Sequence, residues 1–399
     1  MKRFIFSAIA LMVAMTACTE GGLIDAPQFY SSEIVFDTYI GKSPITKAEN
    51  IDLTYLETNS VGGAHLYAFT CDKDNRNVSD VDFTAAYLDG RLMCTTPTNY
   101  NTDPITSGVW AYQIKSLKEG TTDEYEWITE EAYWPGETKD LAFAAYNLAA
   151  ESCIDLENQT LTHFDFTIKS DVKDQIDLLV TPLTFKSETG NQTTVSLRFH
   201  HLLSRVGFKV LPTTASSTVS INIYSLKLTG AFPESGYVNL TSSVSPAVPK
   251  IIPHSDAENI PEYSLFYGNE AFSISSADCA ETDNTATPAT TTIVAKPIYP
   301  NSVTTPDPEN RFMMIMPGTQ SNASIQVEYN LSGQGDVRSY ARIPLVGNNG
   351  TDWVFEAGKA YEFILKISTD SIEFESEVLD GWDEYPTTDT TKPLVPKPV

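Results

Sequence analysis

The segment SLRFHHLLSRVGFKV, residues 196–210, is strongly hydrophobic and places two histidines side by side. Side chains alternate between the two faces of a β-strand, so neighbouring histidines would point apart. One face would carry Leu197, Phe199, His201 and Leu203, and the other Arg198, His200 and Leu202. Two strand histidines that bind one metal are expected at i and i+2. The pattern therefore predicts that the pair belongs to the wall of a sheet, with His201 hydrogen-bonded through one ring nitrogen.

Segments of the same kind recur on both sides of this stretch. They are short, rich in β-branched and aromatic residues, and separated by clusters of Gly, Pro, Asn, Asp and Thr. The clearest are EIVFDTYI, GAHLYAFT, DLAFAAYNL, QIDLLVTPL, VSINIYSLKLTG, RFMMIMPG, SIQVEYNL and AYEFILKIS. Helical periodicity sustained over several turns is hard to find. The sequence predicts an all-β protein built from β-sandwiches.

The length of 399 residues is more than one hydrophobic core usually serves. A polar, glycine-containing stretch, TFKSETGNQTT, separates two apolar strands near the middle of the chain. We therefore expect an N-terminal β-sandwich domain over residues 48–190 and a C-terminal one over residues 191–385. A Pro-rich tail, residues 386–399, is expected to be extended.

The N-terminal sequence MKRFIFSAIALMVAMTACTEGG has the pattern of an export signal. Lys2 and Arg3 precede a short apolar core, which at Phe4 to Met15 is below the roughly 20 residues that span a bilayer. The pattern resembles a bacterial lipoprotein signal, residues 1–17, in which the next residue, Cys18, takes the lipid. This predicts attachment to the outer membrane through Cys18, with ordinary secretion as the alternative.

Composition excludes some partners. The formal charge of −26 becomes −28 once Lys2 and Arg3 are removed with the signal, and the remaining basic residues are scattered singly. A nucleic acid would be repelled by such a chain. The cysteines match no metal spacing, and both buried free thiols and one disulfide remain open, with Cys71 and Cys94 as the candidate pair. Asp72 and Asp74 are spaced like calcium ligands but lack the rest of an EF-hand loop, so no metal or other cofactor is expected.

Seven segments, taken in order, resemble the fimbrillins of the Bacteroidales, the FimA and Mfa-like group that forms type V pili. They are the lipoprotein signal, EIVFDTYIGKSPITKA, YWPGETKDLAFAAYNL, QIDLLVT, VSLRFHHLLSRVGFKV, FMMIMPG, and WVFEAGKAYEFILKIS with LDGW. The resemblance covers nearly the whole chain. It implies two tandem transthyretin-like β-sandwich domains and a non-enzymatic structural or adhesive subunit of a cell-surface fimbria.

The resemblance also implies how the subunit assembles. In the family, a protease cuts after a basic residue beyond the first strand, that strand leaves, and a strand of another fimbrial subunit takes its place. Residues 18–47 would be the removed segment, with its strand at Glu33 to Ile40. Ile34, Phe36 and Thr38 would line one face of this strand. The matching cut lies between Lys47 and Ala48.

The C-terminal tail leaves the role within the fimbria open. Prolines at 386, 393, 396 and 398 remove backbone donors from the tail, so a tip or minor subunit that accepts a strand without donating one is expected. Such a subunit would bind a host or bacterial surface ligand. The alternative is a lipid-anchored surface lipoprotein that binds glycans through aromatic side chains. Trp110, Trp127 and Trp134 are the candidates. An enzyme is disfavoured because no catalytic constellation is present.

Overall fold

The computed structural model describes most of the chain between residues 32 and 379. The described residues are 32–40, 62–96, 108–136, 138–156, 159–188, 194–213, 219–265, 271–283, 290–298, 312–333, 337–347, 350–368 and 372–379. Within these ranges the chain is all-β, and the helical content is three short turns, η1 (Val78–Asp80), η2 (Leu148–Cys153) and η3 (Val172–Asp174). The predicted fold class is confirmed.

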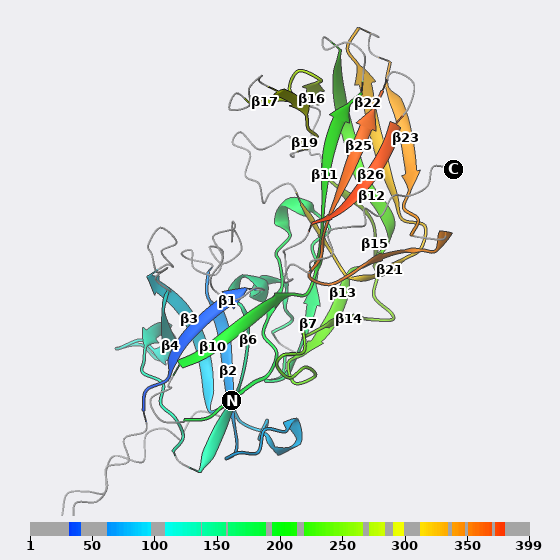
Figure 1. The fold of residues 1–399 in the computed structure, drawn as a ribbon. Helices are drawn as coiled ribbons and strands as arrows, with labels where there is room; N and C mark the ends of the chain where they lie inside the picture. Colours follow the sequence, from blue (N-terminus) through cyan, green and yellow to red (C-terminus); the bar gives the residue numbers. More distant parts are fainter. Residues whose placement is uncertain are drawn as a thin grey trace, which may run out of the picture. The chain divides into compact units, whose positions relative to one another are not determined.

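The largest sheet gathers the strands of the first half of the chain (Figure 1). It runs β1-β10-β8-β6-β2-β3-β4-β5, with β9 paired to β6. The bounds are β1 (Val35–Ile40), β2 (Ala64–Asp72), β3 (Leu88–Thr96), β4 (Val109–Leu117), β5 (Tyr125–Thr129), β6 (Lys139–Asn147), β8 (Leu179–Val180), β9 (Thr184–Lys186) and β10 (Thr194–His201). The path ends at β1, whose partner β10 is distant in the sequence, and at β5, whose partner β4 directly precedes it.

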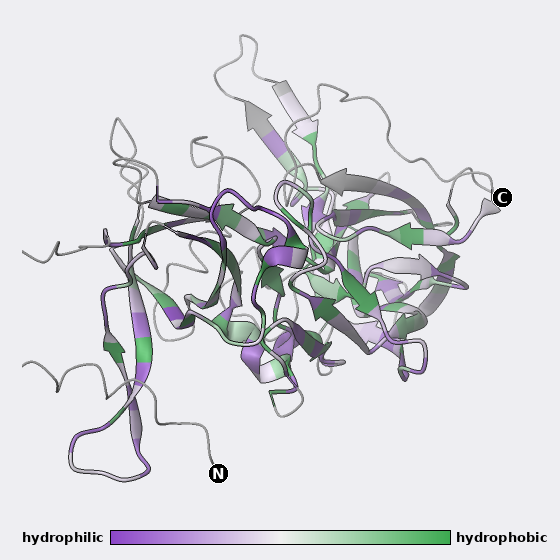
Figure 2. Cartoon of the chain, turned by 90° about the horizontal axis from the view of Figure 1, so that it is seen from below, coloured by the Kyte–Doolittle hydropathy of each residue, from purple (hydrophilic) through white to green (hydrophobic). Residues whose placement is uncertain are grey.

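The centre of this sheet is buried on both faces, which explains the continuous apolar run in β6. Leu141 and Phe143 point into one hydrophobic cluster, whereas Ala142, Ala144 and Tyr146 point into another. A strand covered on both faces reads as an unbroken apolar run rather than as an alternation. Figure 2 shows hydrophobic stretches on the strands beside hydrophilic ones.

The remaining strands form smaller sheets. One runs β19-β11-β25-β26 with β20 paired to β11, and another runs β15-β12-β22-β23 with β16 paired to β12. The others are β14-β13-β7, β17-β18 and β21-β24. The bounds are β7 (His163–Thr167), β11 (Ser204–Pro212), β12 (Ser220–Pro233), β13 (Ser235–Asn239), β14 (Ile251–Pro253), β15 (Asn259–Ser264), β16 (Phe272–Ser275), β17 (Ala280–Asp283), β18 (Thr290–Ile293), β19 (Lys296–Pro297), β20 (Met313–Ile315), β21 (Gly318–Gln320), β22 (Ser324–Leu331), β23 (Ser339–Pro344), β24 (Trp353–Phe355), β25 (Ala360–Ile367) and β26 (Ile372–Leu379).

Hydrophobic side chains from these sheets and from the large sheet join in one core cluster that extends from Tyr67 to Ile367. Its aromatic contacts include Phe208 with Phe363, whose ring centroids are 5.8 Å apart. β10 pairs in the large sheet although it follows the boundary predicted near Gly190. The chain passes to the smaller sheets between β10 and β11.

The two histidines lie at this passage. His200 and His201 are both buried, and Nδ1 of His201 is hydrogen-bonded to the carboxylate of Asp177. This agrees with a structural role in the wall of the sheet. The regular alternation expected through Leu203 stops at His201, because β10 ends there and Leu202 and Leu203 both enter the larger core cluster.

Candidate functional site

β1 is an edge strand that pairs with one neighbour in the sheet. It runs parallel to β10, with a register from Val35 opposite Thr194 to Ile40 opposite Phe199 (Figure 1). Just before β1 begins, the backbone N–H of Ile34 donates to the carbonyl of Ala132 at 2.7 Å. The first strand of the chain is therefore fixed by residues far away in the sequence.

Side chains of β1 and of the residue before it alternate between core and solvent. Ile34, Phe36 and Thr38 are 3%, 4% and 4% exposed, whereas Val35 is 48% exposed. These three buried residues are the ones that the sequence placed on one face of the first strand. Their burial agrees with that placement, and their release during assembly remains a prediction.

Phe36 reaches the centre of the smaller hydrophobic cluster. Its ring lies 6.3 Å from that of Tyr112 and 6.2 Å from that of Phe143, the second in an edge-on arrangement. Gly90 makes room for the Tyr112 ring, since a Cβ atom at Gly90 would lie 2.7 Å from it. We call this the β1 cluster. Its members are Ile34, Phe36, Ala64, Leu66, Ala68, Leu92, Trp110, Tyr112, Ala132, Trp134, Leu141, Phe143, Ala145, Leu179, Val195, Leu197 and Phe199.

The membership of the β1 cluster has a simple pattern. Apart from Ile34 and Phe36, every member lies between residues 64 and 199, in the strands of the large sheet and the segment before β6. Sequence reasoning placed the two β1 residues on an inner face but missed their partners, such as Tyr112 and Phe143. Local periodicity carries no signal for contacts between strands that are so far apart in the chain.

Burial affects two polar groups of β1, the Thr38 hydroxyl and the Asp37 carboxyl. The hydroxyl of Thr38 is buried and finds no hydrogen-bond partner among the described residues. Burial raises the pKa of the Asp37 carboxyl, although a hydrogen bond from the Thr38 backbone opposes the shift. The Thr38 hydroxyl lowers the stability of β1 in the precursor, since a buried polar atom without a partner costs about 1–3 kcal/mol.

The other predicted site residues are distributed as follows. Cys18, Lys47 and Ala48 lie outside the described residues, as does the tail from residue 386. Trp110 and Trp134 are buried in the β1 cluster and serve packing. Trp127 is 36% exposed, with the guanidinium of Arg91 4.4 Å from its ring centroid.

The disulfide that the sequence allowed between Cys71 and Cys94 is not formed. Cys71, Cys94, Cys153 and Cys279 form no disulfide, and burial raises the pKa of the Cys71 thiol to about 11. Asp72, one of the two aspartates that are spaced like calcium ligands, accepts a hydrogen bond from Lys139 at 2.6 Å. In the described ranges no cluster of three or more His, Cys, Asp and Glu residues is arranged to hold a metal ion. Nor does any helix there have the length and hydrophobicity to cross a membrane.

Comparison with known proteins agrees with this architecture. The family model described as fimbrillin-like matches residues 92–382. A fimbrial protein from Bacteroides vulgatus is 16% identical with a TM-score of 0.54, over 88% of this chain and 99% of that chain. A fimbrial assembly protein from Parabacteroides distasonis is 10% identical with a TM-score of 0.37, over 88% and 98% of the two chains. Comparison with curated proteins gives no match.

The family match covers most of the chain, and the structural likeness to the Bacteroides vulgatus protein shows the same fold. The chain belongs to the fimbrillin-like family. It is therefore a fimbrial subunit with a structural or adhesive role in a cell-surface appendage, and its partners include other fimbrial subunits.

Proposed function

We propose that this protein is a non-enzymatic fimbrial subunit whose β1 strand holds it in a precursor form. Cleavage between Lys47 and Ala48 releases β1, and a strand from another subunit then occupies its place in the β1 cluster. The observation that carries the proposal is that β1 is an edge strand, and that Phe36 within it and Ile34 just before it are buried against distant parts of the chain.

The order of elements along the chain supports this mechanism. β1 ends at Ile40 and β2 begins at Ala64, so Lys47 lies in the connection between them. A cut at this point leaves β1 attached only to the residues before it. The strand would then be held by hydrogen bonds and packing alone.

Energetics explain why release needs a competing strand. Burial of a large apolar side chain contributes about 1.5–3 kcal/mol, so β1 with its two inner apolar residues does not dissociate freely. Its pairing with β10 is parallel, which is slightly less stable per residue than antiparallel pairing. Together with the unpaired Thr38 hydroxyl, this makes β1 replaceable by a better-fitting strand.

The remaining parts of the proposal follow from the sequence. The lipid on Cys18 would anchor the precursor to the outer membrane before cleavage. The chain would consist of two transthyretin-like β-sandwich domains, with the passage from the first to the second after β10. The four prolines of the tail support a tip or minor subunit, which accepts a strand but donates none.

The first test is the N-terminal sequence and intact mass of the protein from native cells, comparing membranes with sheared surface material. We expect a chain that begins at Ala48 in the sheared fraction. A Lys47→Ala variant should accumulate as the uncleaved precursor, whereas Lys42→Ala, which changes another lysine of the same segment, should be processed normally. A protein found only in membranes and still lipidated at Cys18 would instead support a surface lipoprotein.

A second test removes β1 without the protease. Deletion of residues 33–47 should give a protein that self-associates or melts at a lower temperature, because the β1 cluster loses its covering strand. Light scattering and thermal denaturation report the two effects. A well-folded monomer with unchanged melting would contradict the mechanism.

A further inference from the structure

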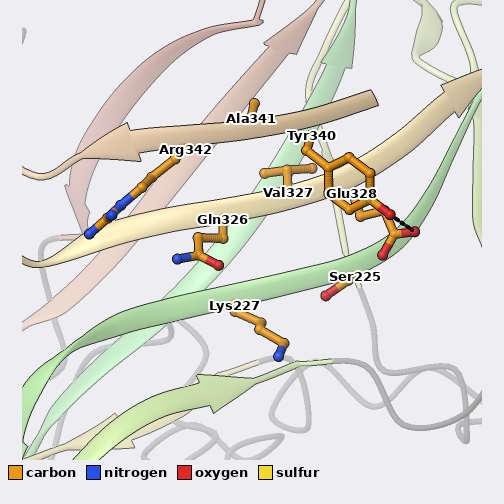
Figure 3. A pocket seen from close by; sticks show the side chains of 8 residues that line it. All are labelled: Ser225, Lys227, Gln326, Val327, Glu328, Tyr340, Ala341 and Arg342. Carbon is orange, nitrogen blue, oxygen red and sulfur yellow. Dashed lines mark hydrogen bonds between the residues drawn. The ribbon is translucent and has the colours of Figure 1, made fainter. Parts of the chain in front are cut away.

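The exposed face of the sheet formed by β12, β22 and β23 is lined by polar side chains, in contrast to the β1 cluster. Lys227, Gln326 and Arg342 stand side by side across the three strands. Ser225, Glu328 and Tyr340 form the next row. We call these six residues the polar face, and they line a hollow of about 380 Å³ (Figure 3).

One end of the hollow is built to receive a carboxylate. Arg342 donates through Nε to the hydroxyl of Ser324 at 3.0 Å, which orients the guanidinium. Its terminal nitrogens find no partner among the described residues. Such a pair of nitrogens binds a carboxylate in a bidentate manner. Lys227 donates to Glu262 at 2.7 Å and has two further N–H groups to offer.

The other end has the groups that recognise sugar rings. Tyr340 is 75% exposed, and its hydroxyl donates to Glu328 at 3.0 Å (Figure 3). The hydrogen bond from Arg338 to Glu328, 2.6 Å long, lowers the pKa of that carboxyl, so it stays ionised and can accept hydroxyl donors. An accessible aromatic ring beside an ionised carboxylate offers stacking and hydrogen-bond acceptance together.

The two ends of the hollow suit neighbouring units of an oligosaccharide. Tyr340 and Arg342 are two residues apart on β23, so their Cα atoms are about 6.6 Å apart along the strand. Figure 3 shows the Arg342 guanidinium directed away from the Tyr340 ring, so a pyranose stacked on Tyr340 would leave Arg342 to the carboxylate of the next unit. Gln326 lies between Lys227 and Arg342 in the first row, and its amide can bond to sugar hydroxyls.

The local charge decides which acidic ligand fits. Three cations, Lys227, Arg338 and Arg342, face two carboxylates, Glu262 and Glu328, so the region carries one net positive charge within a chain of −26. This balance suits a ligand with a single carboxylate per unit. A densely charged polyanion such as a nucleic acid would be repelled by the two carboxylates and by the rest of the chain.

We propose that the polar face binds an oligosaccharide of the uronic acid class, with a carboxylate on Arg342 and a neighbouring sugar ring on Tyr340. This inference goes beyond the proposed assembly and does not depend on it. No residue of β1 and no cleavage at Lys47 takes part.

The test is isothermal titration of the full-length chain, purified in detergent, with a galacturonate trimer. The matched ligand is the same trimer with each carboxylate reduced to an alcohol. We expect the reduced trimer and the Arg342→Gln variant each to weaken binding by about tenfold or more, the loss of a charge-assisted hydrogen bond. Tyr340→Ala should weaken binding of both trimers.

Tyr125→Ala is the control variant. Tyr125 is 52% exposed on β5, away from the polar face, and its loss should leave binding unchanged. The proposal is overturned if the galacturonate trimer does not bind at millimolar concentration, if both trimers bind equally, or if Arg342→Gln binds normally. Equal binding of a triglutamate peptide would overturn the choice of a saccharide.

Discussion

The β1 cluster and the polar face are both surfaces of β-sheets, but they bind through different groups. The β1 cluster surrounds a strand with apolar side chains, and the strand adds backbone hydrogen bonds to β10. The polar face leaves its side chains partly or fully exposed and offers charges, an amide and one aromatic ring. A fimbrial subunit needs both kinds of surface if it assembles through one and adheres through the other.

The difference shows how side-chain burial separates the two roles. Phe36 in the β1 cluster is 4% exposed, whereas Tyr340 on the polar face is 75% exposed. Loss of an aromatic ring should therefore reduce stability at one site and ligand binding at the other. The predictions below test this division.

The largest effect is expected from Phe36→Ala. The ring contacts Tyr112 and Phe143, and its removal leaves a cavity that should cost about 4 kcal/mol in the free energy of unfolding. Chemical denaturation of the uncleaved precursor should show this loss. Val35→Ala, on the outer face of the same strand, should change the free energy of unfolding by less than about 0.5 kcal/mol. Equal effects of the two substitutions would mean that β1 does not cover the cluster.

Much of the β1 site could be predicted from the sequence. The alternation in EIVFDTYI gave the inner positions Ile34, Phe36 and Thr38, because side chains of period two must divide between core and solvent. The pairing of β1 with β10 could not be predicted this way. That contact joins residues about 160 positions apart, since Val35 lies opposite Thr194, and no local pattern specifies such a partner.

The polar face escaped sequence analysis for another reason. Gln326 and Glu328 alternate with buried Ile325 and Val327, which is the ordinary pattern of a strand with one face in water. Only the register with β12 and β23 brings Lys227 and Arg342 beside them. The apolar pattern of residues 196–210 also predicts that the strand continues through Leu203. In the structure, Leu202 and Leu203 instead lie in the connection between β10 and β11.

A smaller, stabilising effect is expected from Thr38→Val. The substitution keeps the shape of the side chain and removes a buried hydroxyl that has no partner among the described residues. The precursor should gain about 1–2 kcal/mol in the free energy of unfolding. Thr38→Ser, which keeps the hydroxyl and loses a methyl group, should be less stable than the wild-type chain. A loss of stability in Thr38→Val would show that the hydroxyl is satisfied.

A weaker effect is expected from pH. Burial lowers the pKa of His65, but hydrogen bonds to Asp89 and Glu151, 3.0 Å each, and the charges of these carboxylates outweigh it and raise the pKa overall. His65 lies on β2 between Ala64 and Leu66, two members of the β1 cluster.

Because the folded pKa is raised above its unfolded value, protonated His65 stabilises the fold fully below about pH 6.5, and this contribution is lost as pH rises through the folded pKa. We expect the free energy of unfolding of the wild-type chain to fall by about 1 kcal/mol or less between pH 6 and pH 8.5. His65→Gln should remove that part of the pH dependence. An unchanged pH profile in the variant would assign it to other groups.

The smallest effect on stability is expected from Tyr340→Ala, which is the counterpart of Phe36→Ala. The Tyr340 ring lies in solvent and its hydroxyl makes one surface hydrogen bond to Glu328, which retains Arg338. Its removal should leave the melting temperature unchanged within error, because surface substitutions rarely alter stability. A clear drop in melting temperature would mean that the ring supports the sheet, and weaker saccharide binding by this variant would then reflect lost structure. Unchanged melting together with weaker binding would separate adhesion from folding at the level of a single side chain.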